Sequence, residues 1–99
     1  MDREAREAYL RRREEALDRV RRLLVTSLEL PRAPDEIDPD TSLFGTGLGL
    51  DSVDAVEIVI ALEMSFGIKL TDPDERRRAL RSVNTLVDVV LVRLGEVSA

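Results

Sequence analysis

The sequence contains no histidine, no cysteine and no tryptophan. Without histidine, the chain lacks the side chain that most often acts as a general base near neutral pH. Without cysteine, it has neither a thiol nucleophile nor a disulfide, and the commonest zinc ligands are missing as well. A reaction at this chain that needs a histidine base or a thiol would therefore require another molecule to supply that group.

Aromatic residues and long apolar runs are also scarce. Only three aromatic residues are present, and no apolar run approaches the roughly 20 residues that span a bilayer. The first residues are densely charged, where a signal peptide would carry an apolar stretch. The 99 residues are long enough for one domain with a small aliphatic core. We therefore expect a cytoplasmic protein with no membrane span. We also expect it to be a monomer.

Positive charge is nearly absent from the middle of the chain. Residues 29–63 carry nine acids and one base, Arg32, whereas residues 1–22 carry eight arginines and six acids. An acidic field of this kind disfavours nucleic acid and would steer a basic partner surface toward the middle of the chain. Charge alone leaves open the simpler explanation that these are solvated surface residues.

Apolar residues recur at helical spacing and predict an all-α fold, a small four-helix bundle of three long helices and one short one. The first helix should end near residue 28 and the second should run from Asp51 or Ser52 to Gly67. The short helix should begin at Asp72-Pro73, and the last should be capped by Ser82 and closed by Gly95. A long loop, 30–50, separates the first two helices. The residues expected to pin it are Ile37, Leu43, Phe44 and Leu48.

The charged residues 1–15 are predicted to extend the first helix, and residues 16–97 to form the folded domain. The second helix carries two apolar stripes. The core stripe is Ala55, Ile58, Val59, Leu62 and Phe66. The second stripe is Val53, Val56, Ile60 and Met64, bordered by Asp54, Glu57 and Glu63. A helix that is apolar on two sides is either buried on both or presents one of them to a partner.

Ser52 begins the second helix, directly after the glycine-studded loop 44–49. The glycine spacing matches neither nucleotide-binding motif, and a serine hydrolase would need a histidine. Asp51 and Asp54 lie on an exposed helix start with no apolar pocket suited to acid–base catalysis, so no catalytic residue is predicted. Ser52 is then either a helix cap or a hydroxyl that another protein modifies. A phosphodiester attached there would lie near the positive end of the helix dipole.

The stretch from Gly49 to Glu63, continuing from Phe66 to Leu70, resembles the acyl carrier proteins, and the similarity runs from about Val20 to Leu91. The resemblance implies that Ser52, within the Asp51-Ser52 motif, carries 4′-phosphopantetheine transferred from coenzyme A. Residues 16–97 would be the acyl carrier domain, which holds acyl groups as thioesters and is not itself an enzyme. The implied partners are a phosphopantetheinyl transferase and acyl-loading, condensing and acyl-transfer enzymes.

The resemblance also implies a partner-docking surface on the second helix and a core stripe that lines a cavity for the acyl chain. The docking residues would be Val53, Asp54, Val56, Glu57, Ile60 and Met64, beside Asp51. The chain departs from the family pattern at Val53, usually leucine, and at Met64 and Ser65, often acids. It departs again at Arg76, Arg77, Arg78 and Arg81, because the short helix is commonly acidic. These departures favour a dedicated lipid or polyketide-type pathway over general fatty acid biosynthesis. A peptidyl carrier of nonribosomal synthesis and an unmodified helical interaction module remain as alternatives.

Overall fold

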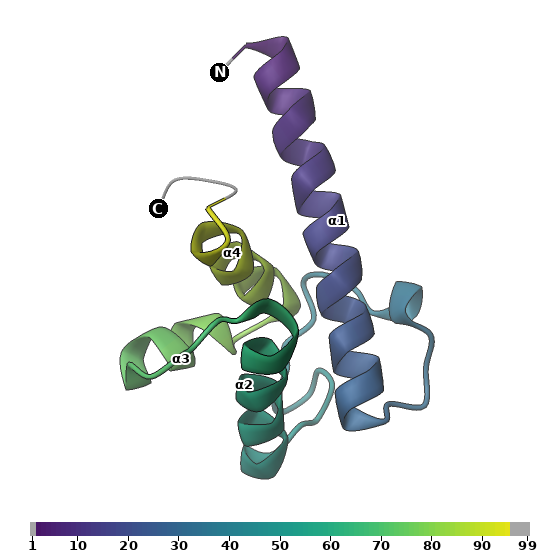
Figure 1. Cartoon of the computed structure of the whole chain (residues 1–99). Helices are drawn as coiled ribbons and strands as arrows, with labels where there is room; N and C mark the ends of the chain where they lie inside the picture. The colour runs from purple at the N-terminus through teal and green to yellow at the C-terminus, as the bar shows by residue number, and fades with distance from the viewer. Residues whose placement is uncertain (1, 96–99) are drawn as a thin grey trace.

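The computed structural model describes residues 2–95, and over that range the chain is helical, with no strand beyond two isolated bridges (Figure 1). The helices are α1 (Arg3–Leu28), α2 (Ser52–Phe66), α3 (Pro73–Ala79) and α4 (Val83–Arg93), with a single 3-10 turn at Pro34–Glu36. The predicted all-α fold of three long helices and one short helix is confirmed. Residues 96 and 97 of the predicted domain lie outside the described residues, as does Met1.

The helices begin and end where capping side chains and glycines stand. The carboxylate of Asp51 accepts a hydrogen bond from the Asp54 amide at 2.9 Å, and the Ser82 hydroxyl accepts one from the Thr85 amide at 3.2 Å. These bonds satisfy amides that a helix start leaves without partners. Gly67 ends α2 with a φ of 70°, a left-handed conformation that costs glycine little. The predicted boundaries are therefore confirmed.

The core lies where α1 packs against α2 and α4. Each of these helices contributes fully buried aliphatic side chains, among them Leu24 from α1, Leu62 from α2 and Leu86 from α4. Burying one such side chain contributes about 1.5–3 kcal/mol. Within residues 2–95 the core holds no buried polar or charged residue. No helix of this range has the length and apolar content to cross a membrane.

The N-terminal half of α1 projects past the other helices (Figure 1). A helix of 26 residues is about 39 Å long, which accounts for the longest dimension of the molecule, 41 Å. The predicted extension is continuous with the rest of α1. Arg13 ties it to α4, because its guanidinium donates to the Asp88 carboxylate at 2.5 Å and to the Asn84 side-chain oxygen at 3.0 Å.

The long loop between α1 and α2 is held against the start of α4. The amide of Leu43 donates to the Arg81 carbonyl, and the amide of Val83 donates to the Thr41 carbonyl, each at 3.2 Å. Ile37 and Leu43 are fully buried, and the other two predicted pins, Phe44 and Leu48, are half-buried. These hydrogen bonds and buried side chains thus fix the position of the loop before it enters α2.

A close approach inside this loop requires glycine. A Cβ atom on Gly47 would lie 1.9 Å from the carbonyl oxygen of Ser42, far inside van der Waals contact. The same carbonyl accepts a hydrogen bond from the Leu48 amide at 2.9 Å. Gly47 therefore lets the loop fold back on itself just before the start of α2.

Candidate functional site

Ser52 is the first residue of α2, and its side chain is exposed. A reciprocal capping box precedes it: Asp51 accepts from the Asp54 amide at 2.9 Å, and Asp54 accepts from the Asp51 amide at 3.0 Å. Because Asp51 supplies the cap, the interpretation of Ser52 as a cap residue is wrong. The Ser52 hydroxyl makes no hydrogen bond to another residue of the range 2–95. It is a free hydroxyl at the positive end of a helix dipole.

Two hollows meet at Ser52. The larger, of about 510 Å³, lies between the start of α2 and α3, and we call it the Ser52 groove. It is lined by Phe44, Ser52, Ala55, Pro73, Arg76, Arg77, Leu80 and Arg81. The smaller, of about 410 Å³, runs along α2 and is lined by Ser52, Ala55, Val56, Val59, Ile60 and Arg76. A group attached to Ser52 would therefore have apolar surface on two sides, contributed by both stripes of α2.

Arginines from α3 stand beside this serine. The guanidinium of Arg76 donates to the carbonyl oxygen of Leu70 through Nε at 3.2 Å and through Nη2 at 2.9 Å, which fixes the half-buried side chain at the edge of both hollows. The sequence singles these arginines out but does not place them, because only the packing of α3 brings them to Ser52. It gives no signal that Pro73 and Leu80 would line the groove.

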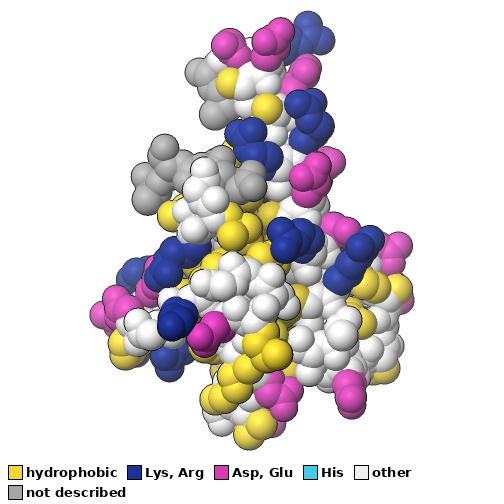
Figure 2. Space-filling view, viewed as in Figure 1, with side chains coloured by type: hydrophobic (Ala, Val, Ile, Leu, Met, Phe, Trp, Pro, Cys, Tyr) yellow, Lys and Arg dark blue, Asp and Glu magenta, His cyan; other side chains and the backbone are white. Residues whose placement is uncertain are grey.

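The second stripe of α2 is exposed. Of the two alternatives for this helix, burial of both apolar sides is therefore wrong. The exposed fractions are 64% for Val53, 58% for Val56, 52% for Ile60 and 82% for Met64. Hydrophobic side chains gather over α2 in Figure 2, with acidic side chains beside them. We call these four residues the exposed stripe. An apolar surface of this kind is typical of an interaction site.

The acids near the exposed stripe differ in what they already bind. The carboxylates of Asp51 and Asp54 are both used in the capping box. Glu63 lies 3.8 Å from the ammonium of Lys69. Glu57 is exposed and has no hydrogen bond or ion pair within residues 2–95. Of the acids on this helix, Glu57 is thus the one whose carboxylate has no interaction at all within residues 2–95.

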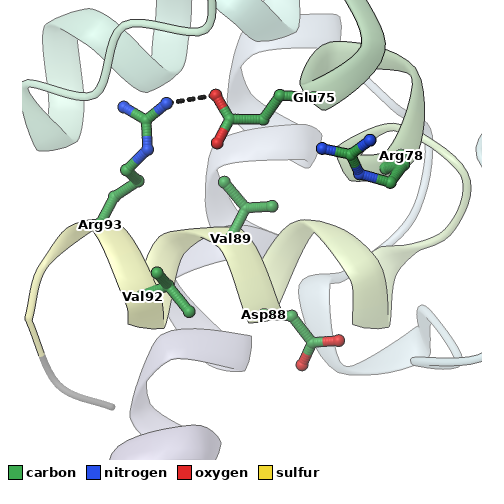
Figure 3. A pocket seen from close by; sticks show the side chains of 6 residues that line it. All are labelled: Glu75, Arg78, Asp88, Val89, Val92 and Arg93. Carbon is green, nitrogen blue, oxygen red and sulfur yellow. Dashed lines mark hydrogen bonds and ion pairs between the residues drawn. The ribbon is translucent and has the colours of Figure 1, made fainter. Parts of the chain in front are cut away.

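A further hollow, of about 310 Å³, lies between α3 and α4 and does not include Ser52 (Figure 3). An ion pair between Glu75 and Arg93 crosses it, and Val89 lies beneath that pair. Arg78 lines this hollow, whereas its neighbours Arg76 and Arg77 line the Ser52 groove. The arginines of α3 are therefore divided between two sides of that helix.

Known proteins and a family model are similar to the part of this chain that contains Ser52 and α2. A family model described as the phosphopantetheine attachment site matches residues 18–90, which include Ser52, all of α2 and α3 and most of α4. The acyl carrier protein of Thermosynechococcus vestitus is 33% identical over 76 residues, covering 77% of this chain and 88% of the relative. A Schizosaccharomyces pombe protein, named as a candidate mitochondrial acyl carrier protein, is 45% identical over 51 residues. That match covers 52% of this chain and 45% of the relative.

Proposed function

This chain belongs to the phosphopantetheine attachment family of acyl carrier proteins, and from that premise we propose that Ser52 carries its 4′-phosphopantetheine. Members of the family hold the cofactor covalently and act as carriers rather than catalysts. This chain is therefore a carrier that modifying and acyl-handling enzymes use. The observation that supports Ser52 is its exposed hydroxyl, which has no hydrogen-bond partner within residues 2–95 and lies where the two hollows meet.

The surroundings of Ser52 fit a phosphodiester. In the transfer, a bond forms between Oγ of Ser52 and a phosphorus of the coenzyme A diphosphate. The bond from that phosphorus to the bridging oxygen breaks, adenosine bisphosphate leaves, and the serine proton passes to a base. We propose that the transferase supplies this base, because the neighbouring carboxylates of Asp51 and Asp54 already bind backbone amides. The start of α2 and the fixed Arg76 guanidinium both favour the negative charge that remains.

Modification in vitro tests the attachment residue. We expect coenzyme A, magnesium and a broad-specificity phosphopantetheinyl transferase to add the mass of one phosphopantetheine to the wild type. Ser52→Ala should abolish the adduct. Ser65→Ala, which removes another exposed hydroxyl from the same helix, should leave it unchanged. A Ser52→Ala protein that is still modified at the wild-type rate would overturn the assignment.

We propose that the exposed stripe docks the partner enzymes, with Glu57 as the charged contact and Asp51 and Asp54 contributing to the negative field. The support is the exposure of Val53, Val56, Ile60 and Met64. Glu57→Lys should slow acyl transfer from a partner and weaken its salt dependence, because rim charges act mainly on the association rate. Glu14→Lys, the same charge change on exposed α1 surface, is the matched control. Equal transfer rates for the two variants would show that docking lies elsewhere.

We also propose that the carrier serves a dedicated lipid or polyketide-type pathway. The support is the set of arginines on and just after α3, of which Arg76, Arg77 and Arg81 line the Ser52 groove. We further propose that residues 1–15 are an extension and residues 16–97 the acyl carrier domain, and that the chain is monomeric. Light scattering of the full chain tests the monomeric state. Circular dichroism and phosphopantetheine loading of a chain without residues 2–15 test whether the remaining residues form the domain. The cytoplasmic location stays a prediction, since the S. pombe relative carries a mitochondrial name.

A further inference from the structure

The Ser52 groove combines an apolar floor with a basic rim. We call its apolar lining residues, Phe44, Ala55, Pro73 and Leu80, the floor, and its basic lining residues, Arg76, Arg77 and Arg81, the rim. No aspartate or glutamate is among the residues that line it. Its volume of about 510 Å³ falls within the range of about 300–1,000 Å³ that small-molecule sites occupy. The groove therefore has the size and composition to hold an apolar chain that carries negative charge.

The positive charge of the rim is only weakly neutralised by the chain itself. Arg76 spends two of its donors on the neutral carbonyl of Leu70. Arg77 pairs with Asp74 at 3.3 Å, but both side chains are more than two-thirds exposed, and such pairs contribute little. The Arg81 guanidinium makes no hydrogen bond or ion pair within residues 2–95. In Figure 2 basic side chains lie over α3 together with acidic ones, beside the hydrophobic surface of α2.

The charges that line the Ser52 groove distinguish two kinds of acyl group, those that end in a methyl and those that end in a carboxylate. A phosphodiester on Ser52 carries one negative charge, and three guanidinium groups line the groove. Asp74 pairs with Arg77 and the phosphate adds a second negative charge, so one of the three positive charges remains after the phosphate is attached. An acyl group that ends in a methyl would cover the floor and leave that charge unpaired. An acyl group that ends in a carboxylate would cover the apolar floor with its carbon chain and pair its carboxylate with the arginines of the rim. Arginine binds carboxylates through paired hydrogen bonds.

Resting on the proposed attachment at Ser52 and on the acyl cavity that the family resemblance implies, we propose that the arginines of the Ser52 groove bind a carboxylate at the free end of the tethered acyl group. The cargo of this carrier is then a thioester of a dicarboxylic acid rather than of a simple fatty acid. A tether of this kind gives its end an effective concentration in the millimolar range. A contact whose dissociation constant is in the millimolar range is therefore populated when the ligand is tethered. The groove is concave, so a flat acidic protein surface would reach the rim without filling the floor.

The test compares two cargoes of equal length on the full chain. Amide-linked coenzyme A analogues load Ser52 with adipoyl or with hexanoyl, and intact mass confirms each product. The adipoyl carboxyl carries a ¹³C label, and its titration is followed by NMR. We expect its pKa to be lower by about 1 than in free adipoyl-pantetheine, because nearby guanidinium groups favour the carboxylate. The side-chain N–H signal of Arg81 should shift with adipoyl and stay in place with hexanoyl.

Matched variants locate the effect in the groove. Arg77→Gln combined with Arg81→Gln should return the carboxyl to the pKa of the free analogue. Arg78→Gln removes one positive charge from the side of α3 that faces α4, and should retain the lowered pKa, whereas Arg81→Gln alone should raise it part of the way (Figure 3). An adipoyl carboxyl that titrates as in solution on the wild-type carrier would overturn this proposal alone. So would equal Arg81 shifts with hexanoyl. A chain that takes no adduct at Ser52 would overturn both proposals.

Discussion

Two isoleucines of α2 provide the sharpest test of its two faces. Ile58 is fully buried, and Ile60, two residues further along the same helix, is 52% exposed. The same substitution, isoleucine to alanine, removes three carbon atoms at each position. A difference in stability between the two variants therefore reports the burial of the side chain and not the chemistry of the change.

The expected losses follow from that burial. Removing three buried carbons costs about 2.4 kcal/mol in transfer free energy, at about 0.8 kcal/mol each. At Ile58 the cavity left behind is added to this cost, so Ile58→Ala should lose about 3–4 kcal/mol. At Ile60 about half of the transfer term applies, and alanine returns a few tenths of a kcal/mol in helix propensity. Ile60→Ala should therefore lose about 1 kcal/mol.

Urea unfolding followed by circular dichroism at 222 nm measures both values, since the chain has no tryptophan for fluorescence. In thermal unfolding, the melting temperature should fall by about 15 °C or more for Ile58→Ala and by about 5 °C for Ile60→Ala. The far-ultraviolet spectra of the folded variants should be alike. Equal losses at the two positions would refute the assignment of one face to the core and the other to the surface.

Three further substitutions test the structure around Ser52 and the start of the chain. Gly47→Ala should destabilise the fold by about 2 kcal/mol in urea unfolding, because its Cβ would meet the Ser42 carbonyl, and an unchanged midpoint would contradict this close approach. Asp51→Ala should cost about 1 kcal/mol by loss of the cap and speed hydrogen exchange of the Asp54 amide; unaltered exchange would argue against the capping box. Arg13→Ala should cost about 0.5–1 kcal/mol and reduce the salt dependence of stability, since its ion pair with the exposed carboxylate of Asp88 is partly screened by salt. A salt dependence equal to that of the wild type would count against that ion pair.

The sequence was sufficient to predict the helices because local signals mark their ends. Asp51, Asp72 and Ser82 stand directly before helices, and Gly67 stands directly after one. Each acts through bonds to residues two to four positions away, so no knowledge of packing is needed. The core face of α2 is also visible in the sequence, since it follows from the period of the helix.

Contacts between distant segments could not be predicted in this way. Whether the second stripe of α2 was buried depended on where α3 packs, and periodicity does not contain that information. The same packing brings Arg76 and Arg81 beside Ser52. The use of Asp54 in the cap was missed for a different reason, because a carboxylate at that position fits both a cap and a docking contact. The tie between Arg13 and Asp88 joins residues 75 positions apart.

The attachment of phosphopantetheine to Ser52 is the central claim, and site mapping on the native protein tests it most directly. Trypsin should cleave after Arg32 and Lys69 and release residues 33–69, which contain Ser42, Ser52 and Ser65. Fragment ions of this peptide, prepared from the carrier isolated from its own cells, separate the three serines. We expect the phosphopantetheine mass on Ser52 alone. The mass on Ser42 or Ser65, or a peptide without it in every growth condition, would contradict the account.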